Sequence, residues 1–322
     1  MLIDILLIAL SVVLLVAGAE ALVRGACGIA LLAKITPAVV GLTIVAAGTS
    51  MPEMVVSLQA AYEGLPGLSI GNVVGSNIFN IAVVLGLTSM VNPLIIQGNT
   101  VRFEWPVMMI GTSVLYLLMR DGSLDRTEGF FLLAAMISFT IYVVWVGRTQ
   151  ADVREKLEMK SPLTASFGKT GVISLVLNTG AVAIGIVLLA GGSTALVRGA
   201  TGIASAMGIS DTIIGLTIVA AGTSMPELVT SAIAAWRGHD DIAVANVIGS
   251  NIFNTLGILG TTALVLPLSV PHEILTRDSF WMMGLALVLF PMIRSGLRLS
   301  RRDGAVLFVA FVVYMKVLIA TI

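Results

Sequence analysis

Charge is scarce in this 322-residue chain: 11% of its residues are Asp, Glu, Lys or Arg, whereas 57% are hydrophobic and the mean hydropathy is +1.03. A soluble domain carries about 25% charged residues, so the composition excludes a soluble protein and predicts an integral membrane protein. The apolar runs are continuous rather than alternating, which excludes a transmembrane β-barrel. At about 20 residues per spanning helix, the chain has room for about eight to eleven helices.

Cysteine and histidine are almost absent, and positive and negative charges balance. The single cysteine, Cys27, excludes an internal disulfide framework and a cysteine zinc cluster. The two histidines, His239 and His272, lie in short polar connections, where we expect them to be solvated rather than metal-bound. A net charge of zero excludes nucleic acid as a partner. Asp4 rather than a basic segment opens the first apolar run, so we expect a spanning helix there and not a cleaved signal.

A thirteen-residue stretch, GLTIVAAGTSMPE, occurs twice without a change, at residues 41–53 and 215–227. Around it, residues 18–86 align with residues 192–260 at a constant offset of 174, without a gap and with 39 identities in 69 positions. Convergence of two apolar segments does not maintain a fixed register across loops. The pattern therefore indicates an internal duplication.

The apolar runs predict an all-α polytopic membrane protein with ten transmembrane helices, arranged as two inverted five-helix repeats. The predicted helices cover residues 2–32, 37–62, 67–93, 103–119, 125–147, 170–205, 211–236, 241–266, 279–295 and 303–321. The one substantial hydrophilic segment divides the chain into a first repeat at 1–147, a cytoplasmic linker loop at 148–169 and a second repeat at 170–322.

Lysine and arginine predict the orientation in the membrane. With the N-terminus outside, twelve assignable basic residues fall inside and three fall outside, Arg120, Arg126 and Arg277, in agreement with the positive-inside rule. Five helices separate equivalent positions, so the second repeat enters the membrane the other way up. Inverted repeats with polar sites near the midplane are typical of secondary transporters.

Each duplicated motif combines a helix break with a carboxylate. Pro52 removes a backbone donor and Gly48 adds local freedom, so carbonyl groups near Ala46 lose their usual partners. Unwound backbone in a membrane is tolerated where it lines a cavity, and free carbonyls suit a cation. A proline kink with Ser and Thr capping their own backbone is the alternative. Glu53 and its copy Glu227 favour the cation site, because a carboxylate at membrane depth costs about 2.5–3.5 kcal/mol and marks a functional site.

The helix after each motif carries a polar stripe. Asn72, Ser76 and Asn80 are four residues apart and share one face. Their copies are Asn246, Ser250 and Asn254. Carboxylates, hydroxyls, amide oxygens and carbonyls, without thiolate or imidazole, favour hard cations such as Na⁺, Ca²⁺ or Mg²⁺. Hydrogen bonding between helices is the alternative role of the asparagines, and it is compatible with ligation.

The two glutamates also constrain what the site holds. Two like charges about 4 Å apart repel by about 4 kcal/mol at an effective dielectric of about 20. We therefore expect the site to hold a divalent ion, two monovalent ions or a proton, and exchange between these occupants follows naturally.

GTSMPE followed by GNVVGSNIFN, and GTSMPE followed by ANVIGSNIFN, resemble the paired repeats of the calcium/cation antiporter superfamily, in its prokaryotic sodium/calcium exchanger family. The resemblance implies electrogenic exchange of Na⁺ for Ca²⁺ by alternating access, in which the first and sixth helices slide against the other eight. It implies a central calcium site made by Glu53, Glu227 and the backbone carbonyls of Thr49 and Thr223. The implied sodium ligands and middle position are Ser50, Ser76, Ser224, Ser250, the carbonyls of Ala46 and Ala220, and the side chains of Asn80 and Asn254.

One departure from related proteins bears on the coupling ions. Potassium-dependent exchangers resemble this chain but carry Asp at the position of Asn254, so the resemblance implies K⁺-independent exchange. Exchange of H⁺ or another cation for Ca²⁺ is the first alternative, although proton/calcium exchangers typically lack the Thr-Ser-x-Pro run. A passive channel is the second, but channels usually build their filter from oligomeric symmetry.

The remaining expectations concern chemistry and location. No histidine or lysine accompanies Ser50 and Ser224 in the repeated motifs, so an enzyme is not expected. The expected partners are Na⁺, Ca²⁺ and the lipid bilayer, with no prosthetic group. The absence of a long regulatory insert favours a prokaryotic inner membrane.

Overall fold

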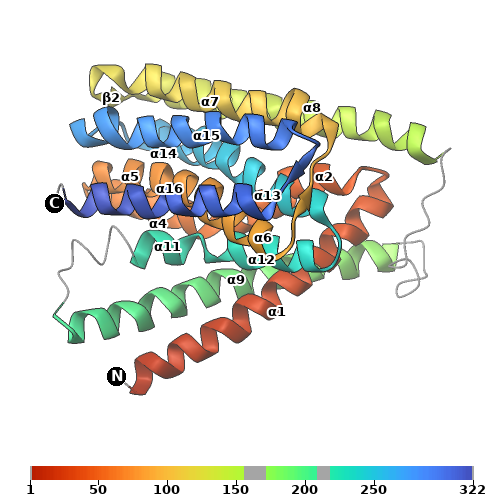
Figure 1. Ribbon diagram of the computed structural model, residues 1–322, viewed down its shortest axis with the longest axis horizontal. Helices are drawn as coiled ribbons and strands as arrows, with labels where there is room; N and C mark the ends of the chain where they lie inside the picture. Colours follow the sequence, from red (N-terminus) through yellow and green to blue (C-terminus); the bar gives the residue numbers. More distant parts are fainter. Residues whose placement is uncertain (1, 156–171, 209–217, 321–322) are drawn as a thin grey trace.

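The computed structural model describes residues 2–155, 172–208 and 218–320 (Figure 1). Within these ranges the protein is helical apart from turns and four two-residue strands. Seven of the described helices are long and apolar enough to cross a membrane, and a helix pair bent at Ser50 adds an eighth. The predicted all-helical, multi-pass architecture is confirmed.

The helices divide between the two halves of the chain. The first half contains α1 (Leu2–Ala33), α2 (Pro37–Val40), α3 (Ala46–Thr49), α4 (Met51–Tyr62), α5 (Pro66–Phe79), α6 (Gly86–Val91), α7 (Trp105–Leu118) and α8 (Arg126–Glu155). The second half contains α9 (Val172–Ala206), α11 (Ala220–Thr223), α12 (Met225–Trp236), α13 (Asp240–Ile252), α14 (Leu259–Val265), α15 (Ser279–Arg294) and α16 (Arg301–Ala320).

Short turns and strands complete the described chain. The π-helical turns are η1 (Gly41–Val45), η2 (Asn80–Leu85), η3 (Thr100–Glu104), η7 (Phe253–Ile258) and η8 (Ile274–Asp278), and a 3₁₀ turn, η4 (Met119–Asp121), follows α7. The strands are β1 (Leu94–Ile95), β2 (Ser123–Leu124), β3 (Leu268–Ser269) and β4 (Arg298–Leu299).

The helices lie close to their predicted positions, with two differences. The turns η3 and η8 precede α7 and α15, so helical structure begins at Thr100 and Ile274 rather than at 103 and 279. Helix α8 continues to Glu155, into the predicted linker, because no Gly or Pro follows Gly147 there to end it. The rest of that linker and the predicted helix start at 211–217 lie outside the described residues.

Two spans form the centre of the molecule: α5–η2–α6 and α13–η7–α14. In their most apolar stretches 83% and 94% of the residues are buried, against 22–39% in the other five candidate spans of the described chain. A span surrounded by protein can carry polar side chains that a lipid-facing span cannot. The polar stripes of the sequence therefore lie in the interior.

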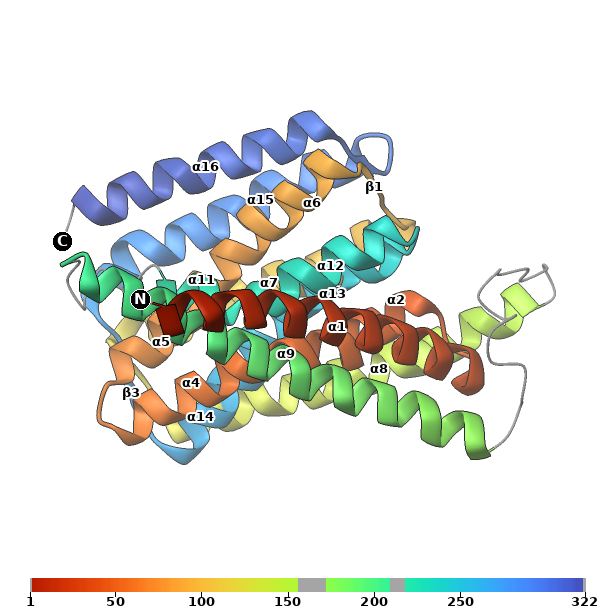
Figure 2. The same ribbon diagram turned by 90° about the horizontal axis from the view of Figure 1, so that it is seen from below.

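Helices α1 and α9 pack on each other along one face of the bundle (Figure 2). Small residues allow their backbones to approach closely: a Cβ atom at Gly18 or Gly185 would lie 2.9 Å or 2.7 Å from a backbone nitrogen of the opposite helix. Close approach at small residues is typical of helix packing in membranes. The contact extends from Gly28 against Asn178 to Gly199 against Asp4, so the pair is antiparallel and continuous.

Two small antiparallel sheets join the halves of the chain. Strand β1 pairs with β4, placing Leu94 opposite Leu299, and β2 pairs with β3, placing Leu124 opposite Leu268. Strands β1 and β3 occupy equivalent sequence positions, yet they belong to different sheets at opposite ends of the bundle (Figure 2). Both chain termini lie at the same end (Figure 1).

Candidate ion-binding site

Each duplicated motif breaks its helix at a serine. Ser50 separates α3 from α4 with φ −84° and ψ 8°, and the helix axis bends there by 44°. Ser224 separates α11 from α12 with φ −89° and ψ 6°. Pro52 and Pro226 lie in the first turn of the following helix, where a missing N–H group leaves no intrahelical bond unmade. The predicted interruption is present in both copies.

The two glutamates are held crosswise by these serines. The Ser50 hydroxyl donates to Glu227 Oε1 at 2.8 Å, and the Ser224 hydroxyl donates to Glu53 Oε1 at 2.9 Å. All four side chains are fully buried. Motifs that are 174 residues apart in sequence therefore meet in the interior, and each carboxylate depends on a donor from the other half.

Four buried oxygen atoms next to this crossing have no hydrogen-bond partner. They are Glu53 Oε2, Glu227 Oε2, Asn80 Oδ1 and Asn254 Oδ1, two pairs related by the duplication. Turn η2, which carries Asn80, packs against α12, and turn η7, which carries Asn254, packs against α4. A buried polar atom without a partner costs about 1–3 kcal/mol, and more if it is charged. Carboxylate and amide oxygens are ligands that hard cations prefer.

A second pair of asparagines orients the first. Asn80 Nδ2 donates to Asn251 Oδ1 at 3.1 Å, and Asn254 Nδ2 donates to Asn77 Oδ1 at 3.2 Å. With its nitrogen engaged, each amide is fixed so that its oxygen is the end without a partner. Asn77 and Asn251 were not among the predicted site residues, although the repeated GSNIFN motif contains both. Their role depends on contacts between the halves that the motif does not specify.

Asn72 and Asn246 hold helices together. Asn72 Nδ2 donates to the Glu53 carbonyl at 3.2 Å and to Ser57 Oγ at 3.0 Å. Asn246 Nδ2 donates to the Glu227 carbonyl at 3.4 Å and to a serine, Ser231, at 2.9 Å. The interhelical role considered for the stripe therefore applies to these two members. They fix the backbone of each glutamate and so its direction.

All twelve predicted site residues lie in described parts of the chain. Eleven are buried, and the last, Ala220, is partly buried. The buried ones are Ala46, Thr49, Ser50, Glu53, Ser76, Asn80, Thr223, Ser224, Glu227, Ser250 and Asn254. The structure brings the two copies of the motif together, and the ligand roles remain predictions. Within the described residues, no group of three or more His, Cys, Asp and Glu side chains forms a metal site, so neutral oxygens must complete any coordination here.

A comparison with protein families gives a match over most of the chain. The sequence profile of the family described as sodium/calcium exchanger protein matches residues 3–145 and 177–320. The chain belongs to this family. The chain is 38% identical to a putative antiporter, CaxA of Alkalimonas amylolytica, with both chains covered completely. It is 32% identical to the sodium/calcium exchanger MaX1 of Methanosarcina acetivorans, covering 98% of each chain, and 32% identical to the inner membrane protein YrbG of Escherichia coli, covering 97% and 95%.

Solved structures agree with this assignment. The sodium–calcium exchanger NCX_Mj superposes on this chain with a TM-score of 0.83, at 29% sequence identity and with 98% of each chain covered. The resemblance noted in the motifs is therefore confirmed across the whole chain. Relatives named as exchangers and antiporters also agree with the expectation that the protein is not an enzyme.

The two helix breaks are not equivalent. The Thr49 hydroxyl lies 3.2 Å from the Ala46 carbonyl and 3.1 Å from Asn246 Oδ1, so the first break is tied to α13. Among the described residues, the equivalent Thr223 hydroxyl contacts its own helix, at 3.0 Å from the Ala220 carbonyl. Ser76, the equivalent of Ser250 in the first half, has a buried hydroxyl without a hydrogen-bond partner. The halves thus share a sequence motif but differ in their contacts.

Proposed function

We propose that the protein exchanges Na⁺ for Ca²⁺ across the membrane and that Glu53 and Glu227 hold the transported Ca²⁺. The observation that carries the proposal is the set of four buried oxygens without partners, two from glutamates and two from asparagines. Two carboxylates balance the charge of one Ca²⁺ or of two Na⁺, so the ions compete for the same negative charge. Family membership and the names of MaX1 and NCX_Mj support this pair of ions.

The sodium ligands proposed are the serine hydroxyls together with the carbonyls of Ala46 and Ala220. The partnerless hydroxyl of Ser76 supports this role. The hydroxyl of Ser250 lies 3.5 Å from the Ala46 carbonyl, so two proposed ligands of one ion are neighbours. The carbonyls of Thr49 and Thr223 would complete the calcium site, since both residues end a half-helix at the break.

We propose ten spans in two inverted repeats, with the N-terminus outside. The cross-pairing of the strands supports the inversion: β1 pairs with β4, whereas its sequence equivalent β3 lies at the opposite end of the bundle. Termini at the same end support an even number of spans. The division at 1–147, 148–169 and 170–322 follows the same reasoning.

Alternating access by sliding of α1 and α9 is the proposed transport movement. These two helices pack continuously on each other and form one face of the bundle (Figure 2). The site itself is carried by the half-helices and central spans behind them. A movement of the pair can therefore change access to the site without dismantling the ligands.

Electrogenic and K⁺-independent exchange completes the proposal. A neutral amide at Asn254 leaves two carboxylates at the centre, which together match a single divalent ion. Exchange of more than two Na⁺ for one Ca²⁺ would move net charge across the membrane. Exchange of H⁺ for Ca²⁺ is the competing coupling.

Calcium uptake into proteoliposomes tests the function. Vesicles loaded with Na⁺ are diluted into buffers of Na⁺, choline or K⁺ that contain labelled Ca²⁺. Uptake is expected only with an outward Na⁺ gradient, at equal rates in choline and K⁺. Valinomycin with a K⁺ gradient sets the membrane potential, and a rate that follows the potential would support electrogenic exchange.

Variants tie the transport to the site. Glu53→Gln and Glu227→Gln should each abolish uptake, because each removes one of the two charges that balance Ca²⁺. Glu63→Gln is the matched control, since Glu63 is an exposed carboxylate at the end of α4. Substantial uptake by either site variant would contradict the assignment. Uptake that follows a proton gradient in the absence of Na⁺ would preserve the site and replace the coupling ion.

A further inference from the structure

A buried carboxylate that the exchange site does not use lies in a cavity at the end of the bundle that holds β1. Glu104, the last residue of η3, is 2% exposed, and Thr100 Oγ1 donates to its Oε2 at 2.7 Å. The cavity beside it has a volume of about 60 Å³. A water molecule needs about 10–15 Å³ of such volume, so the space admits a small ion with some of its water.

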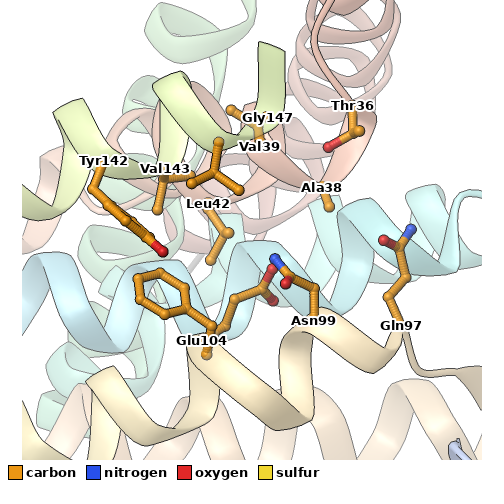
Figure 3. Close-up of a pocket in the computed structure, with 12 residues that line it drawn as sticks. Thr36, Ala38, Val39, Leu42, Gln97, Asn99, Glu104, Tyr142, Val143 and Gly147 are labelled. Carbon is orange, nitrogen blue, oxygen red and sulfur yellow. The ribbon is translucent and has the colours of Figure 1, made fainter. Parts of the chain in front are cut away.

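Three elements that are distant in sequence enclose this cavity (Figure 3). The α2–η1 segment contributes Leu42 and neighbouring small residues, α8 contributes Tyr142, and the segment from β1 to η3 contributes Asn99. Figure 3 shows the carboxyl group of Glu104 beside the amide of Asn99, with the Thr36 side chain at the far wall. Oxygen-bearing side chains therefore lie on more than one wall of the cavity, among apolar side chains.

The second half of the chain has a carboxylate at the equivalent position, Asp278, and the neighbouring Arg277 neutralises its charge. Asp278, which is 174 residues after Glu104 and ends η8, accepts two hydrogen bonds from the Arg277 guanidinium group, from Nε at 2.7 Å and from Nη2 at 3.0 Å. The Tyr314 hydroxyl also donates to it, at 3.3 Å. A buried carboxylate normally requires such a partner, because removing its charge from water costs several kcal/mol.

The first half lacks the corresponding cation. The residue before Glu104 is Phe103, where the second half has Arg277, and its ring contacts that of Tyr142 in a tilted arrangement with centroids 4.6 Å apart. No Lys, Arg or His of the described residues forms an ion pair with Glu104. Among the described residues Glu104 therefore has no cationic partner, and a cavity lies beside it. Of two duplicated carboxylates, one has a built-in cation and the other opens on a cavity.

We propose that this cavity binds a sodium ion, with the Glu104 carboxylate as the charged ligand and the side-chain oxygens of Thr36, Gln97 and Asn99 as neutral ligands. Gln97 Nε2 donates to Asp241 Oδ2 at 3.2 Å, which leaves its Oε1 for the cavity. A single lining carboxylate matches a monovalent ion, whereas Ca²⁺ sites collect more charged oxygens.

This site would be separate from the transport site and would act on it through the backbone. The cavity wall at Leu42 belongs to η1, and η1 leads directly into α3, which ends at the Ser50 break. A bound ion would join Thr36, at the start of α2, to the segment from β1 to η3, and α2 leads through η1 into the half-helix that approaches Glu53. The site lies at the end of the bundle that the basic residues predict to be cytoplasmic.

Thermal unfolding of the purified full chain in detergent tests the proposal in a background that lacks the exchange site. In the Glu53→Gln/Glu227→Gln variant, NaCl is titrated against choline chloride and KCl at constant total salt. We expect a saturable rise in Tm with Na⁺ alone, because a ligand that binds only the folded state stabilises it. Adding Glu104→Gln should abolish that rise, whereas adding Glu63→Gln should leave it unchanged.

A second variant keeps the test decisive if the triple variant does not fold. Thr36→Val in the same background removes one neutral ligand and keeps the shape of the side chain, so the half-saturating Na⁺ concentration should rise several-fold. No Na⁺-specific rise in the background variant, or a rise that survives Glu104→Gln, would overturn the proposal. An equal rise with K⁺, or one produced by Ca²⁺ instead of Na⁺, would overturn the assignment to sodium. Because transport is not measured, the result is independent of the outcome of the uptake experiment.

Discussion

Substitution of Gly185 by alanine tests the packing between α1 and α9. A Cβ atom at this position would lie 2.7 Å from the Leu22 nitrogen, 2.8 Å from the Gly18 carbonyl oxygen and 2.9 Å from the Leu22 Cα. All three are backbone atoms, so no side-chain rotation relieves the overlap. The helices must separate by about 0.7 Å to restore an ordinary contact of 3.4 Å.

The expected loss of stability combines two opposing effects. Overpacking a close contact costs about 1–3 kcal/mol, and because three backbone atoms overlap here at once we expect the upper part of that range, about 2–3 kcal/mol. Alanine favours the helix over glycine by about 1 kcal/mol, which offsets part of that cost. We expect a net loss of about 1–2 kcal/mol, and at about 2–4 °C for each kcal/mol, Tm should fall by about 2–8 °C.

The matched control is Gly191→Ala on the same helix. Among the described residues, no heavy atom outside the backbone of the same helix and the two neighbouring residues lies within 4 Å of a Cβ atom at Gly191, so the helix preference acts alone and Tm should be unchanged or higher. Unfolding in detergent, followed by tryptophan fluorescence, measures both variants. If Gly185→Ala melts at or above the temperature of the unmodified protein, the close backbone contact between α1 and α9 is refuted.

Three further substitutions test other contacts. Asn254→Asp should make calcium uptake sensitive to pH or K⁺, because it adds a third carboxyl group to the centre; an unchanged ion and pH profile in proteoliposomes would show that the amide does not set ion dependence. Asn246→Ala should lower Tm more than Asn72→Ala, because Asn246 Oδ1 also lies 3.1 Å from the Thr49 hydroxyl; equal decreases in Tm would show that this contact does not contribute to stability. Trp105→Phe should cost about 0.5–1.5 kcal/mol in unfolding free energy, because its Nε1 donates to the Ala286 carbonyl at 2.7 Å; a stability equal to that of the unmodified protein would show that the bond contributes nothing.

Local properties of the chain were predictable from sequence. The long apolar runs place the helices, because a spanning helix needs a minimum length of apolar residues whatever its neighbours are. The helix break at Ser50 follows from the glycine and proline around it, which act through the backbone of a few residues. The predicted helix boundaries were wrong at three places. At the starts of η3 and η8 a π turn extends the helix, and at the end of α8 no stop signal ends it.

The candidate site was predictable as a set of residues but not as an arrangement. The duplication identified Glu53 and Glu227 as site residues, because a carboxylate within an apolar run is costly to bury and marks a functional site. That each carboxylate takes its hydrogen bond from the serine of the other half was not predictable. The same holds for Asn77 and its partner in the second half, which orient the amides from across the interface between halves.

The sequence by itself therefore determined the membrane environment, the helix positions, the duplication and the identity of the polar residues at the centre. Each of these depends on composition or on spacing over a few turns. Only the tertiary structure decided which oxygens are satisfied and which are not, and that one duplicated carboxylate, Asp278, is paired while Glu104 faces a cavity. These outcomes depend on contacts between segments more than a hundred residues apart, and a buried polar group acquires its function from the partners that those contacts supply or withhold.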